Sequence, residues 1–276
     1  MSTHEQIDAI AIGGFDGMHT AHQHLFKELG EYGGVIAIET GYADLTPSIC
    51  RQKHTHYPVF YYELDDIKGL SGEAFVAKLK TDFPSLSKIV VGFDFHFGHK
   101  RSCASEDLKH LFDGEVIIVD EVDLEGEAIH SRTIRELLDH GNLQRANHFL
   151  GYNYQIRGTV IKGQGLGKKE LVATLNLEVS RYRLPKEGVY ATLTRLDDDH
   201  LYPSVSFIGK RSITDNSFAI ETHILNKDNI FVTQEAEISF LHYIRENASF
   251  DSFDALKEQI SSDINEAQKV INFLAL

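Results

Sequence analysis

Short apolar segments alternate with helical patterns through the first 120 residues of this 276-residue chain, and this alternation limits the possible folds most strongly. The apolar segments are continuous, as in Gly-Val-Ile-Ala-Ile-Glu at residues 34–39. Continuous apolar strands are typical of a parallel sheet that helices cover on both faces. We therefore expect an α/β domain at the N-terminus. Strands are expected at residues 7–12, 34–39, 57–64, 87–92 and 115–120, and helices at residues 21–32, 72–83 and 105–112.

The pattern changes near residue 150, after a short helical link at residues 141–150. Strand patterns then follow one another until residue 251, and many short antiparallel strands predict a small closed β-barrel. We expect two domains, residues 1–150 and 151–276. The barrel strands are expected at residues 154–162, 188–196, 202–208, 217–225 and 236–244. An amphipathic helix is expected at residues 252–276, with an inner face of Phe253, Leu256, Ile260, Ile264 and Ile271.

Composition narrows the class of protein. The formal net charge of −14 argues against nucleic-acid binding, which needs a basic face. No run approaches the roughly 18 apolar residues of a membrane span, and the N-terminus lacks the basic and apolar regions of a signal peptide. The two cysteines, Cys50 and Cys103, form no disulfide framework. We expect a cytoplasmic protein with reduced thiols, either monomeric or weakly homo-oligomeric.

The most informative stretch, Ile-Ala-Ile-Gly-Gly-Phe-Asp-Gly-Met-His-Thr-Ala-His, runs from Ile10 to His22. Its apolar run stops at Gly13, and His19 and His22 follow at the start of a helical pattern. Residues three apart lie on one face of a helix, so two imidazoles are expected side by side. Backbone N–H groups and the helix dipole favour an anion at that point. The stretch predicts a phosphate site, with a surface histidine pair or part of a metal site as alternatives.

Two further segments are expected at the same edge of the sheet. The fourth strand runs into Gly-Phe-Asp-Phe-His-Phe-Gly-His-Lys-Arg at residues 92–101, which predicts either a stacking wall for a flat ring or phenylalanines that fill the core. After the fifth strand, residues 129–138 read Ile-His-Ser-Arg-Thr-Ile-Arg-Glu-Leu-Leu. Here Ser131 is a candidate N-cap, and Arg132 and Arg135 lie on one helix face. These arginines either belong to an ordinary capped helix or hold phosphates.

The informative stretch of the second half is Gly-Gln-Gly-Leu-Gly-Lys-Lys-Glu-Leu-Val-Ala-Thr-Leu-Asn-Leu, at residues 163–177. It lacks the spacing of a Walker loop, and no helix follows it as a Rossmann fingerprint requires. Such a loop either offers backbone amides and Lys168 to a phosphate or is a flexible glycine-rich hairpin. Thr174 and Asn176 then present oxygen atoms on one strand face. Glu221 lies on a later strand, in Ala-Ile-Glu-Thr-His-Ile-Leu.

In this order, these strings resemble those of the bacterial bifunctional riboflavin kinase/FMN adenylyltransferase (FAD synthetase) family, and the resemblance covers nearly the whole chain. It implies a Rossmann-like nucleotidyltransferase domain with a parallel sheet, then a small antiparallel riboflavin kinase-like β-barrel with a terminal helix. It also implies that ATP phosphorylates riboflavin to FMN and then adenylylates FMN to FAD, releasing pyrophosphate. The implied partners are ATP, riboflavin and FMN, with Mg²⁺ accompanying ATP, and neither nucleic acid nor membrane.

The resemblance also implies roles for individual residues. ATP and its phosphates would contact Gly13, Phe15, Asp16, His19, His22, Ser131, Thr133 and Arg135 in the first domain. The flavin would contact Asp94, Phe95, Phe97 and Arg245. In the barrel, Gly163, Gly165, Gly167 and Lys168 would hold phosphate, and Thr174 and Asn176 would hold the metal. Glu221, His19, His22 and Arg135 would be catalytic, with Glu221 accepting the proton of the riboflavin 5′-hydroxyl.

The chain departs from the family pattern at four places. Relatives usually have Phe-x-Pro-His-Pro where this chain has Ile38-Glu-Thr-Gly-Tyr42, so Tyr42 is expected to replace an aromatic residue of the acceptor site. His130 replaces a usual serine, Ala173 replaces a proline, and Gly209-Lys-Arg-Ser replaces Gly-x-Arg-Pro-Thr. Because two departures lie in the barrel, two alternatives stay open. The chain could be an FMN adenylyltransferase with weakened or lost kinase activity, or a non-catalytic flavin-binding protein.

Overall fold

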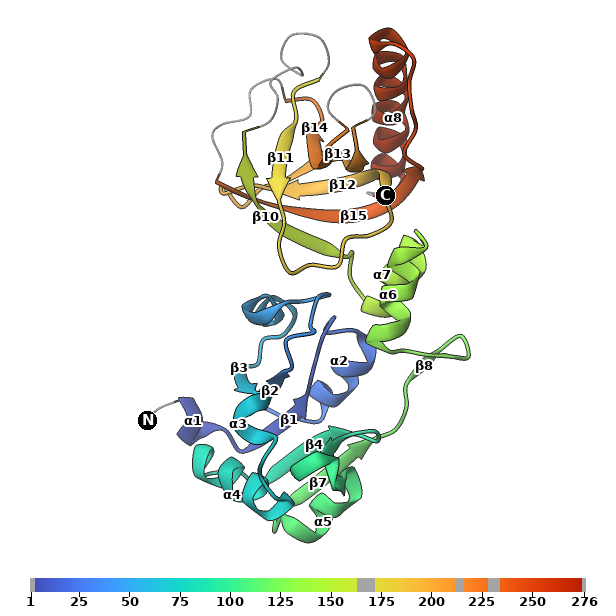
Figure 1. The fold of residues 1–276 in the computed structure, drawn as a ribbon. Coiled ribbons are helices and arrows are strands. Elements are labelled where there is room, and N and C mark those ends of the chain that lie inside the picture. The colour runs from blue at the N-terminus through green and yellow to red at the C-terminus, as the bar shows by residue number, and fades with distance from the viewer. Residues whose placement is uncertain (1–2, 163–171, 212–215, 228–233, 275–276) are drawn as a thin grey trace. The chain divides into compact units, whose positions relative to one another are not determined.

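The computed structural model describes residues 3–162, 172–211, 216–227 and 234–274. The chain divides into two compact units, Met1–Thr133 and Ile134–Leu276 (Figure 1). The first contains a parallel sheet with helices, and the second contains an antiparallel barrel followed by a helix. The predicted fold class is therefore confirmed. The predicted domain boundary near residue 150 stays a prediction.

The first unit is built on a five-stranded sheet in the order β3-β2-β1-β4-β7, with every neighbouring pair parallel. Its strands are β1 (Ala9–Gly13), β2 (Gly33–Glu39), β3 (Val59–Glu63), β4 (Lys88–Gly92) and β7 (Glu115–Val119), with short strands β5 (His96–Phe97), β6 (Cys103–Ala104), β8 (Asp123–Leu124) and β9 (Glu127–Ala128). Its helices are α1 (Thr3–Gln6), α2 (Thr20–Lys27), η1 (Ser48–His54), α3 (Leu64–Ile67), α4 (Gly72–Asp82), η2 (His99–Arg101), η3 (Ser105–Asp107) and α5 (Leu108–Leu111). Helix α6 (Ser131–Asp139) begins at the end of this unit.

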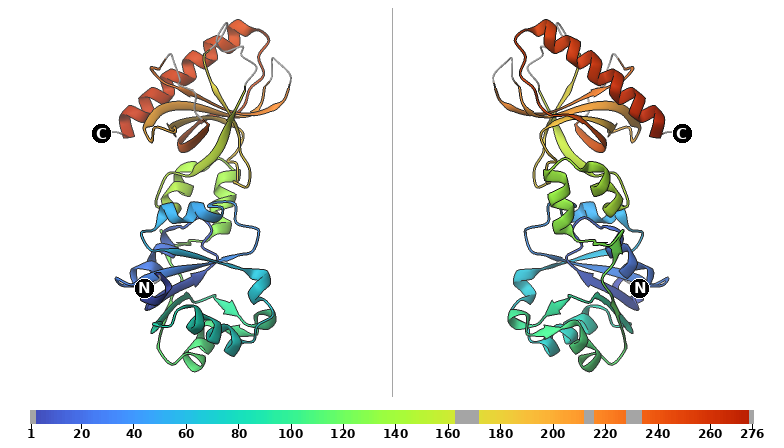
Figure 2. Two further views of the ribbon diagram at one scale, coloured as in Figure 1. Left: turned by 90° about the vertical axis from the view of Figure 1, so that its left-hand side faces the viewer. Right: turned by 90° about the vertical axis from the view of Figure 1, so that its right-hand side faces the viewer.

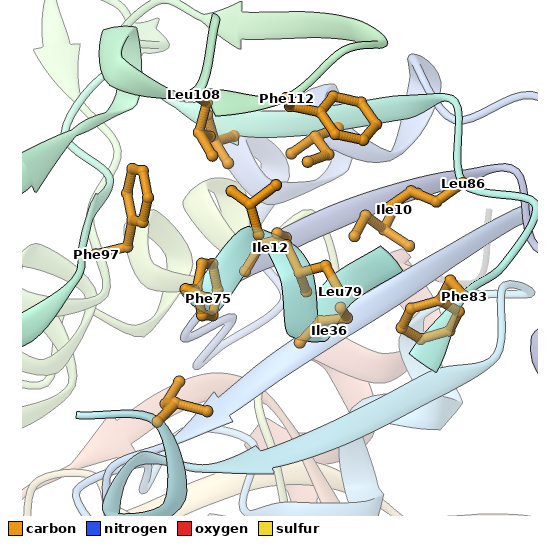
Figure 3. Close-up of a cluster of buried hydrophobic side chains, with 14 of the residues drawn as sticks. Ile10, Ile12, Ile36, Phe75, Leu79, Phe83, Leu86, Phe97, Leu108 and Phe112 are labelled. Atoms are coloured by element: carbon orange, nitrogen blue, oxygen red, sulfur yellow. The ribbon is translucent and has the colours of Figure 1, made fainter. Parts of the chain in front are cut away.

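Apolar side chains cover both faces of this sheet. On one face, Ile10 and Ile12 of β1 belong to a buried cluster with Leu79 of α4 (Figure 3). On the other face, Ala11 packs in a second cluster with Phe26 of α2. Burial on both faces explains why the strands are continuous apolar segments in the sequence.

The sheet order places the glycine turn after β1 and the aromatic loop after β4 at the same end of the sheet, where the strands have their carboxyl ends. Strand β1 pairs with β2 on one side and with β4 on the other. Successive strands are therefore added on one side of β1 up to β3, and on the other side from β4 onward. In open parallel sheets ligands bind at such a switch point, beyond the carboxyl ends of the strands. Gly13 ends β1 and Gly92 ends β4. The glycine turn and the aromatic loop therefore both start at the expected binding edge.

Local details differ from the predictions. Helix α2 ends at Lys27 rather than at residue 32, because the chain turns through Gly30 (φ +76°) toward β2. The helix predicted at residues 105–112 is a 3₁₀ turn followed by the short helix α5. Ser131 lies within the first turn of α6 instead of capping it, and residues 48–54 form a 3₁₀ helix that was not predicted.

The second unit is a closed barrel of six strands in the order β10-β11-β14-β13-β12-β15, with β15 pairing back to β10. All its pairs are antiparallel. Helix α8 packs against β12, β13 and β15 (Figure 2). The strands are β10 (Gln155–Ile161), β11 (Leu175–Glu178), β12 (Gly188–Arg195), β13 (Leu201–Lys210), β14 (Phe218–Ile224) and β15 (Glu235–Arg245), and the helices are α7 (Leu143–Leu150) and α8 (Phe253–Leu274).

The helix α8 buries a narrower face than predicted. Ala267 and Ile271 lie in a buried cluster with Ala191 of β12, and Ile264 packs against this cluster. Phe253, which was predicted on the inner face, is 40% exposed. The prediction for Phe253 is wrong because it is the first residue of α8, before the part of the helix that reaches this cluster.

The barrel interior contains a layer of buried hydroxyl groups. Ala191 faces α8, so its neighbours on β12 with the opposite orientation face inward. Five fully buried side chains hydrogen bond to one another: Thr192, Thr194, Ser204, Ser206 and Thr222. Thr222 contacts both Thr194 (3.0 Å) and Ser206 (2.9 Å). Each buried hydroxyl therefore depends on its neighbours for a partner.

We expect Thr222→Val to destabilise the protein by about 1–3 kcal/mol, because it leaves two buried hydroxyls with one partner fewer. The free energy of unfolding in urea measures this change. Thr159→Val, at an exposed position on β10, makes the same chemical change and should alter stability by less than about 0.5 kcal/mol. Equal effects of the two substitutions would contradict a special role of the hydroxyl layer.

Candidate active sites

The turn between β1 and α2 is strained and points a helix N-terminus toward the sheet edge. Phe15 and Met18 have positive φ angles of 49° and 42°, and Gly17 has a φ of 85°. Left-handed conformations of non-glycine residues are unfavourable and cluster at functional sites. His19 precedes the first residue of α2 in an extended conformation, and its side chain does not cap the helix. The first amide groups of α2 are thus oriented toward any anion bound there.

The two histidines of this turn lie side by side, as their spacing predicts. The rings of His19 and His22 are stacked, with centroids 3.5 Å apart. The edge of the Phe15 ring contacts His22 at 5.1 Å, which shows that the buried Phe15 supports the pair from the core. The Nδ1 atom of His22 is buried and has no hydrogen-bond partner among the residues that the structure describes.

The environment keeps His22 neutral. Burial, followed by the charges of His19, Arg51 and His130, holds the pKa of His22 well below its ordinary value of 6.5. His130 is itself near the carboxylate of Glu121, with Nε2 and Oε1 3.1 Å apart. At neutral pH the His22 ring therefore offers one N–H donor without a positive charge.

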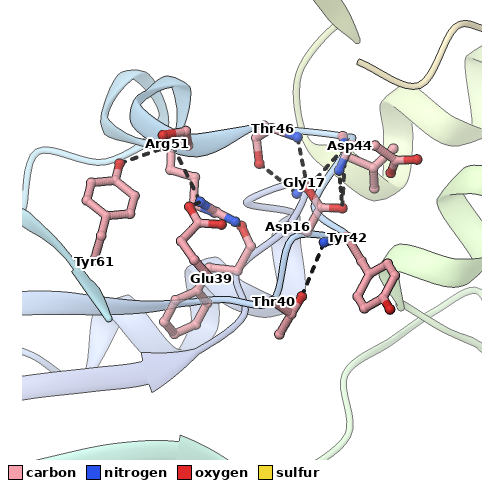
Figure 4. A network of polar contacts seen from close by, with 12 residues as sticks. Asp16, Gly17, Glu39, Thr40, Tyr42, Asp44, Thr46, Arg51 and Tyr61 are labelled. Atoms are coloured by element: carbon pink, nitrogen blue, oxygen red, sulfur yellow. Dashed lines mark hydrogen bonds and ion pairs between the residues drawn. The ribbon is translucent and has the colours of Figure 1, made fainter. Parts of the chain in front are cut away.

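Asp16 organises the loop that follows β2. Its carboxylate accepts hydrogen bonds from the backbone N–H groups of Asp44 (3.2 Å), Leu45 (3.0 Å) and Thr46 (2.9 Å) (Figure 4). The Thr46 hydroxyl in turn accepts a hydrogen bond from the Gly17 N–H (2.8 Å). These bonds show that Asp16 shapes the site. The prediction that Asp16 also contacts ATP stays a prediction.

A buried arginine that was not predicted lies behind the turn. Arg51, in the 3₁₀ helix η1, is fully buried and forms an ion pair with Glu39 at the end of β2 (Figure 4). Its Nε donates to the backbone oxygen of Phe15 (3.3 Å). Its Nη2 has no hydrogen-bond partner in the described part of the chain. A single arginine in a segment without periodic pattern carries no signal in the sequence, so only the fold reveals it.

Ser131 joins the first motif to the third. Its hydroxyl donates to the backbone oxygen of Asp16 (2.7 Å), across 115 residues of sequence. This bond fixes the start of α6 beside the turn. Thr133 and Arg135 follow within the first turns of the same helix. Their predicted roles at the ATP phosphates stay predictions.

The predicted flavin residues after β4 have different surroundings. Phe97 is buried and packs against Phe75 and Phe95, with ring centroids 5.5 and 5.8 Å away. Its ring thus helps to fill the core, which was the alternative interpretation. Phe95 is half-buried, whereas Asp94 is exposed.

Two other aromatic side chains are more exposed to solvent than Phe95 and Phe97. Phe93 is 44% exposed on the same loop, and Tyr42 is 84% exposed on the loop that Asp16 organises. Exposed aromatic rings near a binding edge suit contact with a flat ligand. Tyr42 was predicted to replace a missing aromatic residue, and Phe93 belongs to the aromatic string that was predicted to be a stacking wall.

In the barrel, two predicted site residues lie opposite each other. Asn176 on β11 is paired in register with Glu221 on β14. Arg211, just after β13, bridges them. Its Nη2 donates to Asn176 Oδ1 (2.5 Å), and its Nε donates to Glu221 Oε1 (2.7 Å). Thr174 lies immediately before β11 and is half-buried, while Gly163, Gly165, Gly167 and Lys168 lie outside the described residues.

The donor set of the barrel site fits a hard cation. An amide oxygen, a hydroxyl and a carboxylate are oxygen donors of the kind Mg²⁺ prefers, and nucleotide phosphates usually complete its shell. The observed guanidinium shows that Asn176 and Glu221 already face positive charge. Within the described residues, no group of three or more His, Cys, Asp or Glu side chains could hold a metal ion.

Arg245, a predicted flavin contact, is engaged with α8. Its Nε and Nη2 donate to the two carboxylate oxygens of Asp263 at 2.8 and 2.7 Å. Asp263 is almost fully buried, so this ion pair ties the end of β15 to the terminal helix. The prediction that Arg245 contacts the flavin stays a prediction.

The first unit has two stacked histidines at the start of α2, and the second pairs Asn176 with Glu221. Such groups are of the kind used by enzymes that transfer groups from nucleotides. Residues 58–133 match the family described as FAD synthetase, and residues 150–271 match the family described as riboflavin kinase. A bifunctional riboflavin kinase/FMN adenylyltransferase of Listeria monocytogenes is 30% identical over 92% of this chain and 89% of its own length. The chain therefore belongs to the bifunctional riboflavin kinase/FMN adenylyltransferase family.

Other relatives agree over nearly the full length. The Haemophilus influenzae protein of the same name is 28% identical over 96% of this chain and 94% of its own. A solved structure described as a macrolide-efflux protein from Streptococcus pneumoniae superimposes with a TM-score of 0.81 at 26% identity, covering 95% of this chain and 94% of that one. Among the described residues of this chain, no helix has the length and apolar character needed to cross a membrane.

We expect Glu39→Leu to destabilise the protein by about 3–5 kcal/mol, because it leaves the buried Arg51 guanidinium without its counter-charge. The double variant Glu39→Leu/Arg51→Met removes both charges and should be more stable than the single variant. Urea denaturation measures both. Lys80→Met, in an exposed ion pair with Asp113, is the control and should change stability by less than about 1 kcal/mol. A double variant no more stable than Glu39→Leu would contradict this account.

The lowered pKa of His22 predicts a loss of stability in acid. Below pH 6.5 the unfolded chain takes up a proton at His22 and the folded chain does not, so stability falls as the pH decreases toward the folded-state pKa. The loss is at most about 1.4 kcal/mol per pH unit. Thermal unfolding between pH 7.5 and 5.5 should show a smaller pH dependence for His22→Gln than for the wild type. Substituting the exposed His110 by Gln should leave the wild-type dependence unchanged.

Proposed function

We propose that this chain makes FMN from riboflavin at the barrel and FAD from FMN at the parallel sheet, with ATP as the donor in both reactions. The observation that carries the proposal is the pairing of Asn176 with Glu221 in the unit that matches riboflavin kinase, on a chain whose other unit has the stacked His19–His22 pair. One site has the groups for phosphorylating a hydroxyl. The other has the groups for binding phosphates.

At the sheet edge, a phosphate oxygen of FMN attacks the α-phosphorus of ATP, and pyrophosphate leaves. No covalent intermediate with the protein is needed, so catalysis consists of positioning and charge stabilisation. His19 and His22 donate hydrogen bonds to phosphate oxygens, and the amides of α2 face the same anion. Because His22 is neutral, the cationic side chain of Arg135 supplies positive charge as pyrophosphate develops.

At the barrel, the 5′-hydroxyl of riboflavin attacks the γ-phosphorus of ATP, and ADP leaves. Glu221 accepts the hydroxyl proton as the new bond forms. Thr174 and Asn176 would hold Mg²⁺ with ATP, which would neutralise the charge on the phosphates. Glu221 and Asn176 are adjacent across β11 and β14, so base and metal ligand act at one place.

The acceptor for FMN is proposed at the loops that follow β2 and β4. Asp94, Phe95 and the exposed rings of Tyr42 and Phe93 offer contacts to the isoalloxazine ring. Asp16 fixes the first of these loops through three backbone N–H groups. We also propose a cytoplasmic location, because the sequence has two cysteines without the number or spacing of a disulfide framework.

Two single substitutions should separate the two activities. Asn176→Ala should reduce the formation of FMN from riboflavin by about 100-fold or more, because it removes a metal ligand, and leave the conversion of FMN to FAD within about twofold. His22→Ala should do the reverse. Chromatography of flavin products after incubation with Mg²⁺-ATP measures both rates. Wild-type protein that formed neither product while binding flavin would contradict the proposed function, and loss of both activities in either variant would contradict the division into two sites.

A further inference from the structure

One arginine connects the residues proposed as the metal ligand and the base of the kinase site. The guanidinium of Arg211 donates to Asn176 on β11, to Glu221 on β14 and to the hydroxyl of Ser217 just before β14. The three acceptor distances are 2.5, 2.7 and 2.8 Å. The backbone N–H of Arg211 also donates to the Ser217 carbonyl at 3.0 Å. The arginine is therefore fixed from both its main chain and its side chain.

The surroundings make these bonds strong. Asn176 is 7% exposed, and the side chains of Arg211 and Glu221 are 19% and 23% exposed. Charge-assisted hydrogen bonds in partly dehydrated places are stronger than neutral ones, and the planar guanidinium fixes its partners in direction as well as distance. Arg211 therefore holds the Asn176 oxygen and the Glu221 carboxylate together while no other cation is present.

A metal ion and the guanidinium would compete for the Asn176 oxygen, because both are cations that approach the same amide acceptor. With Nη2 2.5 Å from Oδ1, Arg211 fills the space on that side of the oxygen. A divalent cation approaching the same oxygen would also be repelled by the arginine charge. We therefore expect a metal nucleotide to displace the Nη2 contact, while the contacts to Ser217 can keep Arg211 nearby.

We propose that Arg211 is a positioning residue that acts as a built-in substitute for the metal. In the nucleotide-free barrel it aligns and neutralises Asn176 and Glu221, and the metal nucleotide binds by replacing it at Asn176. This inference rests on the proposed kinase function of the barrel. It predicts that Arg211 competes with the metal form of the nucleotide and not with the nucleotide itself.

The test is isothermal titration calorimetry of ADP on the full chain, with excess Mg²⁺ and, separately, with EDTA. If Arg211 holds Asn176 in about nine-tenths of the free molecules, its removal tightens binding roughly tenfold. We expect Arg211→Met to bind Mg²⁺-ADP about 5–10-fold more tightly than the wild type and to bind metal-free ADP within about twofold. Unchanged or weaker binding of Mg²⁺-ADP, or an equal gain without the metal, would overturn the proposal.

Two further variants separate this competition from simpler effects. Lys210→Met removes an exposed positive charge next to the site and should leave both affinities within about twofold of the wild type, so an equal gain there would mean a general charge effect. In the Asn176→Ala background, Arg211→Met should give no metal-specific gain, because the contested oxygen is gone. A gain that persisted there would contradict the assignment to Asn176.

Folding and kinetics complete the experiment. Circular dichroism and the urea unfolding transition report whether each barrel variant is folded. If Arg211→Met does not fold, Arg211→Lys is the second variant. Its hydrogen bond to Asn176 should be weaker than that of the arginine, so Mg²⁺-ADP should still bind more tightly than to the wild type. In kinase assays the KM for Mg²⁺-ATP should fall with Arg211→Met, whereas a purely structural role would lower kcat alone. Wild-type protein that forms no FMN refutes the proposed function, while an unaltered KM in an active enzyme refutes only this inference.

Discussion

The turn between β1 and α2 is held in its strained shape by three hydrogen bonds to residues far away in the sequence, and the first site depends on them. Arg51 donates to the Phe15 carbonyl, Thr46 accepts from the Gly17 amide, and Ser131 donates to the Asp16 carbonyl. Left-handed residues such as Phe15 and Met18 cost about 1–3 kcal/mol each and persist only where the surroundings over-determine them. Here the surroundings do so, and the result is a fixed helix N-terminus with two stacked histidines.

The two sites solve the same electrostatic problem in different ways. Both proposed sites would receive phosphates, and both contain a permanently charged arginine beside the residues proposed to act there. At the sheet, Arg51 is buried behind the histidines, where it is paired with Glu39 and helps to keep His22 neutral. At the barrel, Arg211 lies on the reacting groups themselves. The first arginine is a fixed part of the scaffold, whereas the second stands where a ligand must go.

Features set by local pattern could be predicted from the sequence. The continuous apolar segment at residues 34–39 predicted a doubly covered strand, because burial on both faces removes the need for alternation. The spacing of His19 and His22 predicted their contact, since three residues span most of one helical turn. The succession of strand patterns after residue 150 predicted the barrel. Element ends were less accurate, as α2 shows, because tertiary packing decides where a helix stops.

Features set by long-range contacts could not be predicted. The bond from Ser131 to Asp16 spans 115 residues, and nothing in either local sequence specifies it. Arg51 lies in a segment without a periodic pattern and was not singled out. Arg211 was named only as part of Gly209-Lys-Arg-Ser, with no role of its own. Phe97 illustrates the opposite difficulty: an aromatic residue in a binding-site motif can equally fill the core, and its packing against Phe75 shows that it does.

The most direct test of two sequential transfers on one chain follows the phosphorus atoms of ATP. Riboflavin would be incubated with the enzyme and Mg²⁺-ATP labelled at either the γ- or the α-phosphate, and the flavin products would be separated. The account predicts γ-label in both FMN and FAD, and α-label in FAD but never in FMN. Any α-label in FMN, or FAD formed from riboflavin without γ-label, would contradict the account.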